Sequence, residues 1–187
     1  MNIYLKGLLS ALALAAVLLG GWFYYSHDMN AAPEGGSLTV LDRLEKEGIP
    51  AFELPDMNGA PIKAESFKGK VVVLNFWATW CAPCVEEFPS MIKMADHFGG
   101  KVLLVTIAAD ERKEDIERFV SALKLKSDHW VALWDPENRV AKQFGTVRLP
   151  ETYILNKDLK LVKKVVNSLD WSAEPVLRYL SEVDSKR

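Results

Sequence analysis

The pattern of apolar positions predicts an α/β domain over most of the chain. Short runs rich in β-branched and aromatic residues indicate strands at 70–77, 102–108, 130–134, 152–155 and 159–167. Apolar residues at helical spacing indicate helices at 82–98, 113–125, 137–144 and 173–183. A turn at 56–59 between two short extended segments predicts a hairpin over 52–64. Strands that alternate with helices and end in a hairpin predict an α/β sandwich with a mixed sheet.

An uncharged stretch of 19 residues, 7–25, precedes this domain. As a helix it would nearly span the ~30 Å hydrocarbon core of a bilayer. Lys6 lies before the stretch and Asp28 after it, which predicts a cytoplasmic N-terminus and an extracytoplasmic domain. The aromatic residues 22–25 favour a retained anchor, although a cleavable signal peptide stays open because small residues suit a peptidase site.

The division of the chain follows from these segments. We expect a membrane anchor or signal segment over 1–26, a linker with a short helix over 27–47, and one folded domain over 48–187. The linker is rich in Gly, Pro and small polar residues, which cannot bury an apolar face. The remaining domain is long enough to build its own core.

Composition excludes several classes of protein. The 187 residues carry 23 Lys and Arg against 25 Asp and Glu, and this balance argues against a nucleic-acid binder. Two cysteines are too few for a disulfide-stapled small domain. They also cannot complete a four-thiolate zinc site, and the chain has only three histidines.

Both cysteines lie in one motif, Trp80-Cys81-Ala82-Pro83-Cys84, between a buried strand and a helix. Unpaired N–H groups at a helix N-terminus stabilise a thiolate, so Cys81 is the candidate attacking sulfur. Cys84 lies one turn later and is the candidate that resolves a mixed disulfide. A C-x-x-C next to a βαβ pattern indicates redox chemistry.

Two other interpretations of this motif are weaker. A metal knuckle needs two further ligands, and no histidine pair at suitable spacing exists. A purely structural disulfide would close a three-residue step, which gives little entropic stabilisation.

Three segments resemble the thioredoxin superfamily and, within it, the membrane-anchored thiol–disulfide oxidoreductases of the TlpA, ResA and CcmG (DsbE) group. They read GIPAFELPDMNG at 48–59, VLNFWATWCAPCVEEFP at 73–89 and LPETYIL at 149–155. The resemblance covers about 48–170. It implies a thioredoxin-like sandwich with an N-terminal hairpin extension and a strand–helix insertion over 102–144.

The resemblance also assigns roles around the cysteines. Pro150 would form a cis peptide bond facing the sulfurs, and the backbone of Leu149 would pair with an extended substrate segment. Trp80, Ala82 and Pro83 would form the rest of the docking face.

Three further polar residues gain expectations from the same resemblance. Asn75 stands where plain thioredoxins carry a buried aspartate, and an amide cannot titrate. Glu87 would then tune the cysteines by exchanging a proton, unless it is an ordinary solvated helix carboxylate, with Glu86 as its exposed neighbour. Glu151 resembles an acidic substrate-docking position of cytochrome-c-maturation members, with a plain surface residue as the alternative.

The implied function is a membrane-tethered thiol–disulfide oxidoreductase on the periplasmic side of the cytoplasmic membrane. It would need no cofactor beyond the Cys81–Cys84 disulfide. A membrane thiol electron donor of the DsbD or CcdA type would reduce it. Its disulfide-containing protein substrates would be apocytochrome c or, as a second choice, a copper-site assembly protein.

Two rival functions stay open. A thiol peroxidase shares the hairpin, but it wants Pro and Thr seven and three residues before the cysteine, where this chain has Leu74 and Ala78. A copper chaperone could use the soft dithiol, but that branch normally spaces its cysteines C-x-x-x-C and adds a histidine.

Overall fold

The computed structural model describes residues 19–20 and 39–186. One compact unit spans Leu38–Arg187. The expected anchor over 1–26 lies outside the described residues, apart from Leu19 and Gly20. Among the residues that the structure describes, no helix combines the length and the apolar character needed to cross a membrane.

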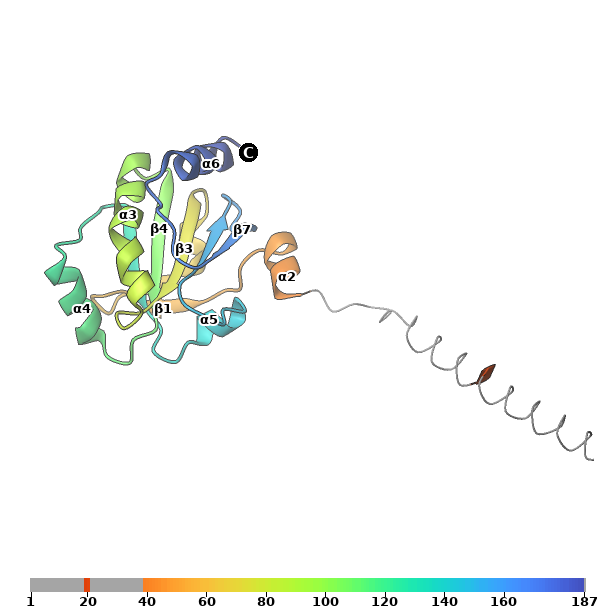
Figure 1. Ribbon diagram of the computed structural model, residues 1–187, viewed down its shortest axis with the longest axis horizontal. Helices are drawn as coiled ribbons and strands as arrows, with labels where there is room; N and C mark the ends of the chain where they lie inside the picture. The colour runs from red at the N-terminus through yellow and green to blue at the C-terminus, as the bar shows by residue number, and fades with distance from the viewer. Residues whose placement is uncertain (1–18, 21–38, 187) are drawn as a thin grey trace, which may run out of the picture. The chain divides into compact units, whose positions relative to one another are not determined.

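The unit is built on a mixed sheet of five strands in the order β5-β4-β3-β6-β7 (Figure 1). β3, β4 and β5 run parallel, and β6 and β7 are antiparallel additions on the other side of β3. The strand bounds are Val71–Trp77 for β3, Val102–Ala108 for β4, Trp130–Trp134 for β5, Glu151–Leu155 for β6 and Leu161–Val166 for β7.

The register of the central strands brings two distant loops together. β3 pairs with β4 from Val71↔Val102 onward and with β6 through Phe76↔Glu151. The carboxyl end of β3 therefore lies beside the amino end of β6. The segment after β3 leads into the two cysteines, and the segment before β6 contains Pro150, so both reach the same edge of the sheet.

Helices cover both faces of the sheet and create two cores. α3 (Ala82–Phe98), α4 (Lys113–Ala122) and α6 (Glu174–Ser185) pack on one face. Trp77 of β3 contacts Phe88 of α3 and Phe119 of α4 there, at ring-centroid distances of 4.5 and 5.0 Å. The other face packs against α2 (Val40–Lys46), the N-terminal hairpin, the 3-10 turn η1 (Ala64–Phe67) and α5 (Arg139–Gln143).

The hairpin consists of β1 (Glu53–Pro55) and β2 (Pro61–Lys63), which pair antiparallel. Asp56 in its turn accepts hydrogen bonds from the backbone N–H groups of Asn58 and Ala60, both at 2.8 Å. The same Asp56 forms an isolated antiparallel bridge with Leu133 of β5. The hairpin is thereby attached to the outer strand of the main sheet.

The helices and strands expected from the sequence are confirmed, with small shifts at their ends. α4 stops at Ala122, short of the expected 125, because Lys124 adopts a left-handed backbone (φ 51°) that no helix can continue. The turn η1 was not expected. The segment expected as an insertion contains β4, α4, β5 and α5, and β5 extends the sheet beyond β4.

Candidate active site

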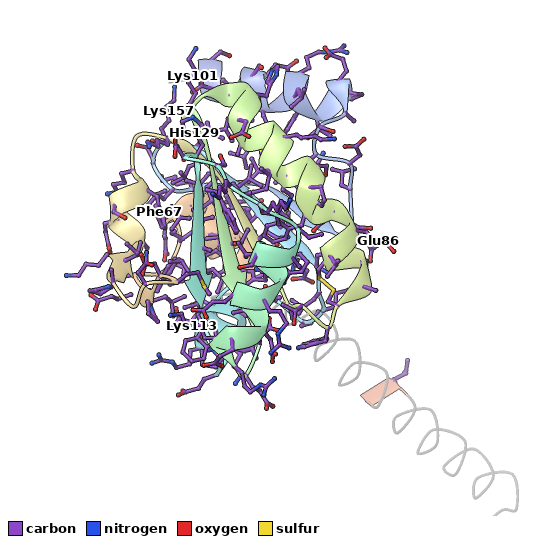
Figure 2. The ribbon with its side chains drawn as sticks, turned by 90° about the vertical axis from the view of Figure 1, so that its left-hand side faces the viewer. Phe67, Glu86, Lys101, Lys113, His129 and Lys157 are labelled. Carbon is purple, nitrogen blue, oxygen red and sulfur yellow. A yellow bond between two sulfur atoms is a disulfide. The ribbon has the colours of Figure 1, made fainter. Side chains whose placement is uncertain are left out.

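A disulfide joins Cys81 and Cys84 at the start of α3, with an S–S distance of 2.08 Å (yellow bond in Figure 2). Cys81 is the N-cap residue of the helix and is 7% exposed, whereas Cys84 is 0% exposed. Ala82 and Pro83 between them are exposed. Only one sulfur of the pair is therefore open to an incoming partner, and it lies at the helix N-terminus.

The loop that leads into the disulfide is held by a buried carboxylate. Asp110, which follows β4 and is 2% exposed, accepts from the backbone N–H of Thr79 at 3.1 and 3.2 Å and from the Thr79 hydroxyl. The backbone carbonyl of Asp110 accepts from Nε1 of Trp134 at 2.7 Å. Trp80, the next residue in the loop, is 70% exposed beside Cys81.

The Leu149–Pro150 peptide bond is cis. The Pro150 carbonyl accepts from the backbone N–H of Asn167 at 3.2 Å. Leu149 is half-buried, and within the described part of the chain its backbone N–H and C=O have no hydrogen-bond partner. This leaves one free peptide edge next to the disulfide, as an added substrate strand would require.

Glu87 lies one turn beyond Cys84 on α3, and its side chain is buried at 4% exposure. Oε2 accepts from the backbone N–H of Leu169 and from Nε1 of Trp171, both at 3.1 Å. Oε1 accepts from Nδ2 of Asn75 at 3.2 Å. Burial raises the pKa of Glu87, and the hydrogen bonds from Trp171, Leu169 and Asn75 oppose that rise only in part.

Asn75 and Glu86 complete this side of the site in different ways. Nδ2 of Asn75 also donates to Oγ1 of Thr152 at 2.9 Å, whereas Oδ1 of Asn75 is buried without a partner. Glu86 is exposed on the outer side of α3 (Figure 2). Of the two neighbouring glutamates, Glu87 is the buried one, three positions after Cys84 on α3.

Glu151 follows Pro150 directly and is 1% exposed. Its Oε2 lies 2.7 Å from Nζ of Lys164 on β7 and accepts from the Tyr153 hydroxyl at 3.2 Å. Burial works to lower the pKa of Lys164, but the hydrogen bond to Glu151 and the contact with Tyr153 outweigh it and leave that pKa raised. The carboxylate of Glu151 is thus engaged inside the protein.

The structure brings most of the sequence-predicted residues together at one edge of the sheet. The sequence did not point to Trp171, Lys164 or Asp110, which lie in other elements and reach the site only through the fold. The available sequence signals were an aspartate soon after a predicted strand, for Asp110, and a tryptophan within a polar segment, for Trp171. Among the described residues, no three His, Cys, Asp or Glu side chains are grouped to hold a metal ion.

Comparison with known proteins decides the family. The model of the AhpC/TSA family matches residues 46–164. The chain belongs to that family. Its resemblance to thiol–disulfide oxidoreductases is also confirmed: the thiol-disulfide oxidoreductase ResA of Bacillus thuringiensis is 33% identical over 151 residues, covering 79% of this chain and 84% of ResA.

Solved structures show the same fold. The thiol:disulfide interchange protein DsbE of Chlorobium tepidum superposes with a TM-score of 0.65 at 24% identity, covering 74% of this chain and 96% of DsbE. The exposed lipoprotein thioredoxin Etrx1 of Streptococcus pneumoniae gives 0.60 at 26% identity, covering 71% of this chain and 99% of Etrx1. The chain is a thiol–disulfide oxidoreductase with a thioredoxin-like fold.

A thiol peroxidase would be expected to carry Pro and Thr seven and three residues before its cysteine, and this chain has Leu74 and Ala78 there. Leu74 and Ala78 are both 0% exposed and belong to the two apolar cores on either side of the sheet. Neither side chain can donate a hydrogen bond to a peroxide oxygen.

Proposed function

We propose that this chain is a disulfide reductase tethered to the cytoplasmic membrane, with its catalytic domain on the extracytoplasmic side. Residues 1–26 would anchor the protein, residues 27–47 would link the anchor to the folded domain, and residues 48–187 would carry the dithiol. The uncharged stretch 7–25 and the charges that flank it support this placement. An oxidising compartment also has need of a dedicated source of electrons for chosen targets.

The observation that carries the proposal is the unequal exposure of Cys81 and Cys84 at the start of α3. In the reduced protein, the Cys81 thiolate attacks one sulfur of a target disulfide, and the other target sulfur leaves with the electron pair. Cys84 then loses its proton and attacks Sγ of Cys81. The second target sulfur leaves, so two electrons pass to the target and the Cys81–Cys84 disulfide remains.

Glu87 takes the proton of Cys84 in this sequence. The two side chains lie at i and i+3 on α3, and positions three apart are neighbours on one face of a helix. Burial raises the pKa of Glu87, so its carboxylate binds a proton more readily than an exposed carboxylate does and can serve as the proton acceptor. Asn75, which cannot titrate, contributes a hydrogen bond instead.

The docking face surrounds Cys81. Trp80, Ala82 and Pro83 are exposed next to it in sequence, and the segment with cis-Pro150 and the free backbone of Leu149 reaches the same edge of the sheet. An extended segment of the target would pair with Leu149 and place its disulfide over Cys81. Glu151 would support this face from inside the protein, since its carboxylate is buried and pairs with Lys164.

The partners follow from the compartment. A membrane thiol donor of the DsbD or CcdA type would reduce the Cys81–Cys84 disulfide. The favoured target is an apocytochrome c, whose haem-attachment cysteines must be reduced before ligation. A copper-site assembly protein is the second candidate.

Trapping tests the proposal directly. In Cys84→Ala the mixed disulfide between Cys81 and a target cannot be resolved, so targets should accumulate as covalent adducts in cells. Adducts should be absent from the matched variant Cys81→Ser/Cys84→Ala. Identification of the adducts by mass spectrometry would contradict the cytochrome assignment if c-type cytochromes are missing from them.

A reduction potential tests the direction of electron flow. A reductant should lie near the roughly −270 mV of thioredoxin, and a value near the roughly −120 mV of DsbA would instead make the chain an oxidant. The measurement is equilibration of the purified domain with glutathione buffers.

A further inference from the structure

The segment that follows β7 holds Glu87 from the side opposite the sheet. Trp171 is 0% exposed, and its indole N–H and the backbone N–H of Leu169 both donate to the same oxygen, Oε2 of Glu87, at 3.1 Å. The backbone N–H of Trp171 donates to Oγ of Ser90 at 3.0 Å. Oγ of Ser90 also donates to the Leu169 carbonyl at 3.5 Å. Two bonds of this segment thus reach the carboxylate, and two join it to Ser90 on the helix beside it.

The two oxygens of Glu87 have different surroundings as a result. An indole N–H and a peptide N–H can only donate, so a proton placed on Oε2 would face two donors. Oε1 has a single partner, the Asn75 amide at 3.2 Å. An amide presents either a donor or an acceptor, depending on which way it is turned.

We propose that Trp171 is a positioning residue for the exchange reaction: its indole N–H, together with the Leu169 N–H, engages Oε2 of Glu87 and leaves Oε1 to carry the exchanged proton. This rests on the proposed role of Glu87 as proton acceptor for Cys84. Because Oε2 is held in place, the proton is directed to the oxygen that lies against Asn75.

Asn75 supplies the second independent observation. Its Oδ1 is buried without a partner, while its Nδ2 donates both to Glu87 and to Oγ1 of Thr152 at 2.9 Å. If the amide turns over, Oδ1 accepts from protonated Oε1 and from the Thr152 hydroxyl, which can donate as well as accept. Asn75 can therefore follow the proton of Glu87 without moving its backbone.

The charged groups around Glu87 are few and exposed. A groove of ≈ 400 Å³ beside α3 is lined by Glu86, Lys93 and Asp170 among others, and it reaches Glu87. Solvent screens these surface charges. Cys84, three positions before Glu87 on α3, carries a buried thiol once the disulfide is reduced. The donors on Oε2 are thus the strongest local influence that opposes the effect of burial on the pKa of Glu87.

The test compares two variants that remove different contacts of the segment. Trp171→Phe keeps an aromatic ring and removes the donor to Oε2, whereas Ser90→Ala removes the other anchor and leaves Oε2 engaged. We expect Trp171→Phe to raise the pKa of Glu87 by roughly one pH unit, because a hydrogen bond to a charged group is lost. Ser90→Ala should leave it unchanged. The carboxyl-carbon NMR signal of Glu87, followed against pH, measures both.

A second measurement uses the native protein and does not depend on a variant that folds. The indole N–H proton signal of Trp171 should titrate with the pKa of Glu87, and those of Trp130 and Trp134 should not. Glu87→Gln should abolish this titration. An indole signal of Trp171 that is independent of pH would overturn the proposal.

The remaining outcomes separate this inference from the role of Glu87 itself. Equal pKa changes in Trp171→Phe and Ser90→Ala would show a structural effect of the segment and overturn the inference. If Glu87→Gln leaves the pH dependence of mixed-disulfide resolution unaltered, the proton role of Glu87 fails. If Glu87→Gln removes that dependence while Trp171→Phe does not shift it, only the positioning role of Trp171 fails.

Discussion

Two of the buried carboxylates of the site, Glu87 and Glu151, have different partners. Glu151 and Glu87 are 1% and 4% exposed, so burial is nearly the same for both. Glu151 has a cation, Lys164, with Nζ 2.7 Å from its Oε2. Glu87 has only neutral partners, namely Asn75, the Leu169 N–H and Trp171.

The difference separates a carboxylate with a charged partner from one that is held by neutral donors. Removing one partner of a buried ion pair leaves the other charge uncompensated, which is strongly destabilising. A carboxylate held by neutral donors is not compensated, so burial raises the pKa of Glu87. Residue type and depth alone therefore say little about whether a glutamate can move a proton.

The largest expected effect comes from removal of the cation. In Lys164→Met, Glu151 would be left without a charged partner, and we expect a loss of about 3–5 kcal/mol in the free energy of unfolding at pH 7. Chemical denaturation measures it. The matched control is Lys163→Met, because Lys163 is exposed and only approaches the Tyr179 ring, at 5.1 Å, which corresponds to about 1 kcal/mol or less. Equal losses in the two variants would contradict the assignment of Glu151 as a paired charge.

Removal of the Glu87 carboxylate should slow the resolution of a mixed disulfide. Glu87→Gln cannot accept the Cys84 proton, and we expect resolution of a preformed mixed disulfide at pH 7 to slow by about 10²-fold. Stopped-flow release of a labelled thiol measures this step. Glu86→Gln is the matched control, since Glu86 is the exposed neighbour and should leave the rate unaltered. The same loss in both variants would make the effect one of surface charge.

The free energy of unfolding should also depend on pH through Glu87. Because its pKa is raised in the folded state, the folded protein binds the proton more tightly than the unfolded chain does. Stability is highest below the unfolded pKa and falls as pH rises through the folded pKa. The fall is about 1.4 kcal/mol for each pH unit between the two values. Denaturation of wild type and Glu87→Gln from pH 4 to 8 should show it in the wild type alone.

The smallest expected change in the free energy of unfolding comes from removal of the Tyr153 hydroxyl, which lies between Glu151 and the segment 144–146. The hydroxyl oxygen of Tyr153 lies 3.0 Å from Oγ1 of Thr146, 3.0 Å from the carbonyl oxygen of Phe144 and 3.2 Å from Oε2 of Glu151. We expect Tyr153→Phe to lose about 1 kcal/mol in the free energy of unfolding. Tyr179→Phe is the control and should be neutral, because the hydroxyl of this half-buried residue of α6 has no hydrogen bond within the described part of the chain. A neutral Tyr153→Phe would remove the hydroxyl from the Glu151 network.

The sequence predicted the fold well because local signals and long-range packing agree here. Continuous apolar runs marked β3 and β4, which are covered on both faces, and the helix over 82–98 has a proline in its first turn and a glycine after its end. The end of α4 was placed too late because the left-handed backbone of Lys124 has no signature in residue type.

Spacing related the site residues that are close in sequence, because the C-x-x-C motif and Glu87 belong to one helix. The family resemblance placed Pro150 at the site, and the Leu149–Pro150 bond is cis. Trp171 lies 84 positions from Glu87, and Lys164 reaches Glu151 through pairing of β6 with β7. Such partners depend on strand order and register, which single-sequence patterns do not contain.

The bridge between Asp56 and Leu133 has a consequence for the behaviour of the protein in concentrated solution. β5 is an outer strand made of uncharged residues, Trp130–Trp134, whereas the other outer strand, β7, carries Lys163 and Lys164. Lysines on an edge discourage pairing with another molecule, and β5 has none. The hairpin protects this edge instead, because Asp56 pairs with Leu133 on the outer strand β5. Loss of the hairpin would therefore favour intermolecular strand pairing and aggregation while the cysteine pair stayed chemically intact.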